Sequence, residues 1–84
     1  MEIIWTKHAE ERQREWQKKL GITSQEIEYV LLNPEQIQMG DQDALVAQSR
    51  RDNGLIRIPF VKAENIIKIL TVYWTSKLDR YWKE

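Results

Sequence analysis

Residues 22–34, ITSQEIEYVLLNP, separate a helical pattern in the first part of the chain from the alternating pattern of strands in the rest. Thr23 and Glu26 form a capping box, which is typical of the first turn of a helix. The apolar residues that follow recur with helical spacing and predict a buried face: Ile27, Val30 and Leu31. The residue before a proline disfavours the helical conformation, so the helix should end before Pro34.

The residues before this stretch predict a strand and a longer helix. Glu2 to Thr6 are mainly β-branched and aromatic, which favours a short strand. Thr6 can then cap a helix from Lys7 to Leu20, and Gly21 is a typical C-terminal stop. The apolar stripe of this helix is narrow, because polar Gln13 interrupts it: Ala9, Trp16 and Leu20.

The residues after Pro34 change to the alternating period of strands. Turn signals at Gly40–Asp43 and at Asp52-Asn53-Gly54 divide this half of the chain. The strands expected between and after these turns are Gln36–Met39, Ala44–Arg50, Leu55–Val61 and Ile66–Thr75. The tail from Ser76 to Glu84 is expected to form a short helix or a strap across the sheet.

Two of these expected strands carry a positional signal. Pro59 cannot donate a backbone hydrogen bond, so it predicts an edge position or a bulge for Leu55–Val61. Ile66–Thr75 is apolar on both faces apart from Lys68, which predicts a central strand.

Together these elements predict an α+β fold with the order β-α-α-β-β-β-β. Two N-terminal helices should pack on one face of a small, mainly antiparallel sheet of four to five strands. A chain of 84 residues is long enough for one modest core, so residues 1–84 are expected to form a single domain.

The charge and composition exclude several classes of protein. The chain has no cysteine and one histidine, which excludes a disulfide-stapled domain and a structural zinc module. A formal net charge of zero argues against a protein that coats nucleic acid. However, residues 1–49 carry a net charge of −4 and residues 50–84 carry +4, so one localised phosphate site remains compatible with the composition.

The sequence also predicts where the chain works. No basic segment followed by a long apolar run is visible at the N-terminus, and no apolar run approaches the roughly 20 residues of a membrane span. We therefore expect a cytoplasmic protein of bacterial style with no membrane partner.

His8 and Arg12 form the first candidate functional pair. They are four residues apart on the expected first helix, so both side chains project from one face. A histidine beside a guanidinium can act as a general acid or base next to a phosphate binder. The alternative is a solvated helix start that happens to contain one histidine.

The second candidate set is basic and aromatic. It joins Arg50 and Arg51 beside the predicted hairpin turn to basic residues of the tail, Lys77, Arg80 and Lys83. The aromatic pairs Tyr73-Trp74 and Tyr81-Trp82 lie among them in the sequence. Arginine with neighbouring aromatic rings can hold a phosphate while bases stack, which suits RNA better than duplex DNA. The alternative is that the tail aromatic residues close the core or form a homodimer interface.

Stronger chemical motifs are absent from the sequence. There is no glycine-rich phosphate loop, and His8 lacks the second histidine of a metalloprotease motif. Asp41 and Asp43 fit a turn better than a metal pair. We therefore expect no metal and no cofactor.

The motif Trp5-Thr6-Lys7-His8-Ala9-x-x-Arg12, followed by Gly21-Ile22-Thr23, Asn33-Pro34 and Leu70-Thr71-Val72-Tyr73, resembles the bacterial domain-of-unknown-function 4258 family. That family is similar in architecture to the RelE and BrnT ribonuclease toxins of toxin–antitoxin pairs, which hold RNA on a sheet and cleave it without metal. The resemblance implies that His8 transfers protons and that Arg12 steadies the phosphate or orients His8. By rough position it also implies roles for Arg80 and Tyr81.

Three functions are compatible with these patterns. The first is a metal-free endoribonuclease of the mRNA interferase type, with a cognate antitoxin-like protein as partner. Its catalytic residues would be His8, Arg12, Arg80 and Tyr81, and its substrate-binding residues would be Arg50, Arg51, Lys77 and Trp82. The second is a non-catalytic module that binds a protein or dimerises, and the third is an RNA-binding module without cleavage.

Overall fold

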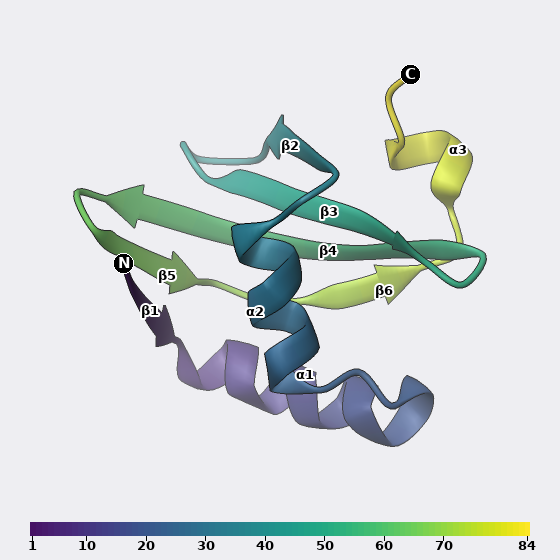
Figure 1. Ribbon diagram of the computed structural model, residues 1–84, viewed down its shortest axis with the longest axis horizontal. Helices are drawn as coiled ribbons and strands as arrows, with labels where there is room; N and C mark the ends of the chain where they lie inside the picture. Colours follow the sequence, from purple (N-terminus) through teal and green to yellow (C-terminus); the bar gives the residue numbers. More distant parts are fainter.

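The computed structural model describes residues 1–84 (Figure 1). Its elements in chain order are β1 (Glu2–Trp5), α1 (Lys7–Leu20), α2 (Ser24–Leu32), β2 (Gln36–Met39), β3 (Leu45–Arg51), β4 (Gly54–Ala63), β5 (Ile66–Ile69), β6 (Tyr73–Thr75) and α3 (Leu78–Tyr81). The strands form one sheet in the order β1-β5-β4-β3-β2, and β6 also pairs with β4. The predicted α+β class is confirmed, with a mainly antiparallel sheet in which only β1 and β5 run parallel.

Both long helices begin and end where their caps require. The hydroxyl of Thr6 accepts a hydrogen bond from the Ala9 N–H, and the hydroxyl of Thr23 accepts one from the Glu26 N–H. These bonds satisfy N–H groups that a helix start leaves without partners. Gly21 ends α1 with a φ of +71°, a left-handed conformation that glycine adopts without a steric cost.

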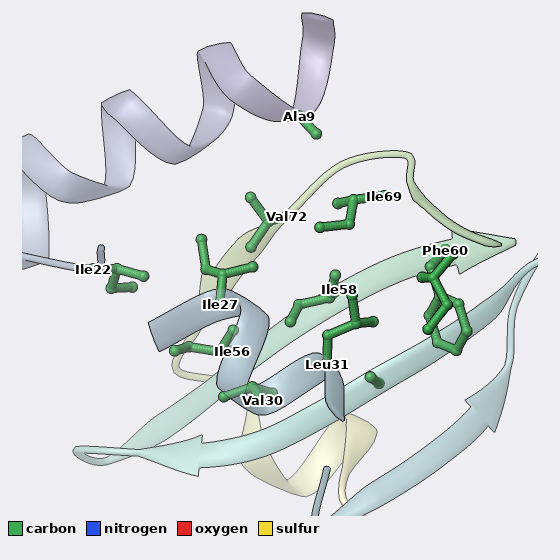
Figure 2. Packing of buried hydrophobic residues seen from close by; sticks show 12 residues of the cluster. Ala9, Ile22, Ile27, Val30, Leu31, Ile56, Ile58, Phe60, Ile69 and Val72 are labelled. Carbon is green, nitrogen blue, oxygen red and sulfur yellow. The ribbon is translucent and has the colours of Figure 1, made fainter. Parts of the chain in front are cut away.

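The core lies between the two helices and one face of the sheet. Figure 2 shows Ile27 and Leu31 of α2 directed at Ile56 and Ile58 of β4, and Ala9 of α1 directed into the same cluster. The polar Gln13 that interrupts the stripe of α1 is also buried. Its amide donates to the Ile22 carbonyl at 3.0 Å, so a polar group within the core keeps a hydrogen-bond partner.

Of the two alternatives that Pro59 predicts, the edge position is wrong, whereas an irregularity of the bulge kind is present: residues 58–59 lie opposite residues 70–72, one residue more on the partner side. The strand that contains it, β4, is central and pairs with β3, β5 and β6. Pro59 falls in the gap between the β4 residues that pair with β6 and those that pair with β5. The carbonyl of Pro59 faces that gap and accepts a hydrogen bond from the Leu70 N–H. The backbone N–H that proline lacks would face the same gap, so its absence removes no hydrogen bond between paired strands.

The expectation of a single strand over residues 66–75 is wrong, although β5 within it is central, between β1 and β4. This segment forms two short strands, β5 and β6, with residues 70–72 between them. The apolar side chains of β5 alternate between exposed and buried positions, because only one face of β5 is covered. The continuous apolar run therefore reflects two consecutive strands with separate registers on β4.

The tail contains both of its expected forms. Residues 78–81 form the short helix α3, and the residues after it lie along β2 and β3 as a strap. None of the three helices is long and apolar enough to cross a lipid bilayer.

Candidate anion-binding site on the open face of the sheet

The face of the sheet opposite α1 and α2, here called the open face, carries polar side chains. Ala47 and Ile58 belong to the core on the helix side and are partners in the β3–β4 register. Because side chains alternate along a strand, their neighbours Gln48 and Arg57 point to the open face, where they are also register partners. A buried arginine therefore lies at the centre of the sheet.

Arg57 is only 7% exposed, and each of its side-chain donor nitrogens has a neutral partner. Its Nε donates to Gln48 Oε1 at 2.9 Å, and its Nη2 donates to Gln38 Oε1 at 3.2 Å. Its Nη1 donates to the Tyr73 hydroxyl at 2.5 Å. The ring of Tyr81 lies 3.9 Å from the guanidinium carbon, which places a cation–π contact over the charge.

No carboxylate neutralises Arg57, because none of the four ion pairs of the molecule includes it. Buried charges in proteins are ordinarily paired, since removing a charge from water is costly. A buried guanidinium surrounded by neutral acceptors is therefore suited to hold an anionic ligand, and its planar fork matches the oxygens of a phosphate.

Three glutamines of the open face hold the C-terminal strap in place. The amides of Gln38 and Gln48 both donate to the Tyr81 carbonyl, at 2.5 and 3.1 Å. The amide of Gln36 bonds both the N–H and the carbonyl of Lys83. The same glutamines that orient Arg57 therefore also fix the backbone of Tyr81 above it.

Arg57 lies in the wall of an open pocket with a volume of about 700 Å³. Arg80, Tyr81 and Tyr73 line the same pocket, and Asp41 contributes the only carboxylate. Val46, Pro59 and Leu70 are among the apolar residues of the wall. The pocket thus combines two guanidinium groups, two phenols and one carboxylate.

Asp41 enters the pocket from the turn between β2 and β3. The sequence predicts this turn, and the backbone of Gln42 and Asp43 adopts positive φ values of 53° and 66°. Residues other than glycine adopt this region at a steric cost, and such residues are frequent at functional sites. The turn is closed by a bond from Ala44 N–H to the Asp41 carbonyl.

The structure brings together two of the predicted catalytic residues and leaves the other two apart. Arg80 and Tyr81 line the pocket, with the Arg80 guanidinium 5.3 Å from the Tyr81 ring centre. His8 and Arg12 are exposed on α1 and do not line this pocket. Arg12 instead forms an exposed ion pair with Glu15 at 2.9 Å.

The predicted substrate-binding residues divide between the two faces. Arg50 stacks on the ring of Trp82 at 4.7 Å, beside the strap. Lys77 is exposed at the start of α3. Arg51 points to the helix side, where it bonds Glu26 at 2.8 Å and the Leu20 carbonyl at 3.0 Å.

Sequence reasoning placed Tyr73 among the aromatic residues of the second candidate set but did not identify Arg57, Gln38 and Gln48 as site residues. One signal was available, because Arg57 is the only charged residue between Gly54 and Val61 in an otherwise apolar strand. A lone charge in such a strand needs a local reason, since burial without a partner is costly.

A pH prediction follows from Glu35, which pairs with Arg50. A hydrogen bond from the Arg50 backbone N–H, together with its guanidinium, holds the pKa of the Glu35 carboxyl below its usual range. A carboxyl whose pKa is lower in the folded protein than in the unfolded chain stabilises the fold at pH values above its unfolded-state pKa. This stabilisation is lost as the pH falls through the folded-state pKa. We therefore expect Glu35→Gln to be less stable than wild type near neutral pH, with the difference shrinking towards about pH 3. Urea unfolding across this range measures the difference, and a constant gap would contradict it.

Comparison with known proteins adds one finding. No curated protein and no solved structure matches the chain. The model of one family, described as a domain of unknown function (DUF4258), matches residues 5–74, from the end of β1 into β6. Because the match covers most of the sheet and both long helices, the chain belongs to the DUF4258 family.

Proposed function

We propose that this protein is an endoribonuclease of the mRNA interferase type and that the open-face pocket is its active site. The observation that carries the proposal is Arg57, a buried guanidinium with no carboxylate partner in the wall of that pocket. An RNA phosphate would supply the missing negative charge. Arg80 adds a second, exposed positive charge at the same pocket.

The aromatic residues of the site favour single-stranded RNA as the substrate. Tyr73 and Tyr81 lie beside Arg57, and Trp82 lies beside Arg50 on the strap. Unpaired bases can stack on such rings while arginines contact the backbone. No helix is offered to a major groove on this face, because the two long helices cover the opposite one.

The proposed reaction is an attack of the RNA 2′-hydroxyl on the adjacent phosphorus. The new bond joins the 2′-oxygen to phosphorus and the bond to the 5′-oxygen breaks, which gives a 2′,3′-cyclic phosphate and a 5′-hydroxyl. A base accepts the proton of the 2′-hydroxyl, and an acid returns a proton to the leaving oxygen. Arg57 and Arg80 would stabilise the negative charge that develops on the phosphoryl oxygens.

The pocket contains candidates for both proton transfers. Asp41 is its only carboxylate and has no ion-pair partner, so it is our candidate base. Phenols carry their proton near neutral pH, so Tyr81 is our candidate acid, with Tyr73 held by Arg57. The role of His8 that the family resemblance implies is tested separately, because His8 lies outside the pocket.

The proposal includes a cytoplasmic site of action and a partner. An endoribonuclease that acts on cellular RNA requires restraint, so an antitoxin-like protein that covers the pocket is the expected partner. Binding of RNA without cleavage is the second function that the same arginines support, and the assay below distinguishes the two.

The proposal predicts cleavage of unstructured RNA by the purified chain in the presence of EDTA. Arg80→Ala should reduce the cleavage rate about tenfold to a hundredfold, because it removes one of the two positive charges at the pocket. Lys62→Ala is the matched control, since Lys62 is exposed and lies outside the pocket. Cyclic-phosphate ends on the product would identify the reaction, and expression of the wild-type chain should arrest growth.

Other outcomes assign the site differently. Binding without cleavage would support an RNA-binding module, and neither binding nor cleavage would leave the protein-interaction alternative. A complete loss of cleavage in His8→Ala, with Arg80→Ala unchanged, would move the active site to the exposed face of α1 and contradict the proposal.

A further inference from the structure

The strand β2 forms one edge of the sheet and leaves a line of backbone groups without strand partners. The backbone N–H of Gly40 donates to the Ala44 carbonyl on the β3 side. Because hydrogen-bonding direction alternates along an antiparallel strand, Gln38 also faces β3, and the backbone groups of Ile37 and Met39 face outward. A second strand could therefore bond to these two residues.

The side chains of these same two residues are apolar and exposed. Ile37 is 55% exposed and Met39 is 79% exposed, both on the helix side of the sheet. Tyr29 and Leu32 of α2 are also exposed, and Leu32 is joined to β2 by only three residues. Ile37 and Met39 are thus two exposed apolar residues on the free strand edge itself.

The β2 edge lacks the features that ordinarily prevent strand pairing. Natural edge strands are protected by charged residues, proline or bulges. Between Gln36 and Met39 there is no charge, no proline and no bulge, whereas the edge strand β1 contains Glu2. A second copy of β2 therefore meets no like charge along these four residues. Just beyond them, Glu35 would lie opposite Asp41 of the second copy, with Glu35 already paired to Arg50.

We propose that two copies of the chain pair through β2, antiparallel, about a two-fold axis that passes through Gln38. In this register Ile37 lies opposite Met39 of the second copy, and Met39 lies opposite its Ile37. The outward backbone groups of both residues then bond in pairs, and their exposed side chains meet across the junction. The strand is thus complementary to itself in both hydrogen bonding and apolar surface.

The proposal has a geometric consequence for the site, although it does not depend on the proposed function. An axis perpendicular to the sheet places both helix layers on one side and both open faces on the other. The turn that carries Asp41 follows Met39 directly, so the pocket of each copy lies beside the junction. The dimer would present two pockets on one continuous face.

A disulfide test takes advantage of the absence of cysteine from the chain. In the proposed register Gln38 faces Gln38 of the second copy as a non-hydrogen-bonded pair, with about 4.5 Å between the Cα atoms. This spacing is within the range of disulfides. Gln38→Cys should therefore form a covalent dimer on mild oxidation, and Ile4→Cys, on the opposite edge strand, should not.

Light scattering on the unmodified chain supplies the second measurement. We expect the wild-type chain to dimerise at protein concentrations between about 1 and 100 µM. We expect Met39→Lys to remain monomeric over the same range, with an unchanged circular dichroism spectrum. Met39 is exposed, so the lysine replaces no core contact. A monomeric wild-type chain at the highest concentration, or a covalent dimer from Ile4→Cys but not from Gln38→Cys, would overturn the proposal.

Discussion

Arg57→Met is expected to weaken the binding of single-stranded RNA about thirtyfold to a hundred-and-fiftyfold. Methionine retains much of the apolar stem of arginine but removes the charge and its fork of donors. Losing a charge-assisted contact to phosphate costs about 2–3 kcal/mol, and the free energy of RNA binding should become less favourable by this amount. The variant removes the cost of burying a charge, but it also leaves the amide oxygens of Gln38 and Gln48 without their donor, which is costly for buried groups.

Two measurements separate these effects. Fluorescence anisotropy with a labelled single-stranded RNA gives the affinity, and urea unfolding gives the free energy of unfolding. Arg14→Met is the matched control, because it also replaces an arginine by methionine but Arg14 is exposed on α1 and lies outside the pocket. A folded Arg57→Met variant with wild-type affinity would show that Arg57 serves the fold instead of a ligand.

Gly54→Ala is expected to destabilise the protein by about 3 kcal/mol or more and to disrupt the pocket. The reason is a close approach, since a Cβ at Gly54 would lie 2.2 Å from the Thr75 carbonyl oxygen and 2.5 Å from the Trp74 ring. The backbone of β6 would have to move away from β4, and overpacking of this kind ordinarily costs 1–3 kcal/mol, occasionally more. Because β6 also carries Tyr73, the movement should displace a partner of Arg57.

Gly21→Ala provides the comparison for this prediction. Gly21 has open space where its Cβ would lie, so its only penalty is the positive φ of 71°. That conformation costs a non-glycine residue about 1–2 kcal/mol. Thermal unfolding of both variants measures the difference, and equal destabilisation would show that the contact between β4 and β6 relaxes without cost.

Local signals in the sequence were sufficient for the helices and most of the strands. The capping box at Thr23 and the glycine at position 21 act within a few residues, so their effects are visible in the sequence and are confirmed in the structure. The two errors concern pairing partners. The gap that accommodates Pro59 and the division of residues 66–75 depend on which strands flank β4, and local periodicity does not contain that information.

The candidate site was harder to predict for the same reason. Arg57, Gln48, Tyr73 and Tyr81 lie on four different elements and converge only through strand register and the path of the strap. Arg80 and Tyr81 were accessible because basic and aromatic residues are adjacent in the tail. The glutamines gave no signal, since their role is to hold a backbone carbonyl that folding brings above β2 and β3.

The central claim is that Arg57 on the open face contacts an RNA phosphate, and side-chain NMR tests it most directly. The Nε–Hε resonance of Arg57 and the side-chain amide of Gln48 should shift when a short single-stranded RNA is added, because Arg57 lies in the wall of the pocket and donates to Gln48 at 2.9 Å. The resonances of His8 and Arg12 should remain unchanged. Shifts confined to α1, with those of Arg57 and Gln48 unmoved, would contradict the claim.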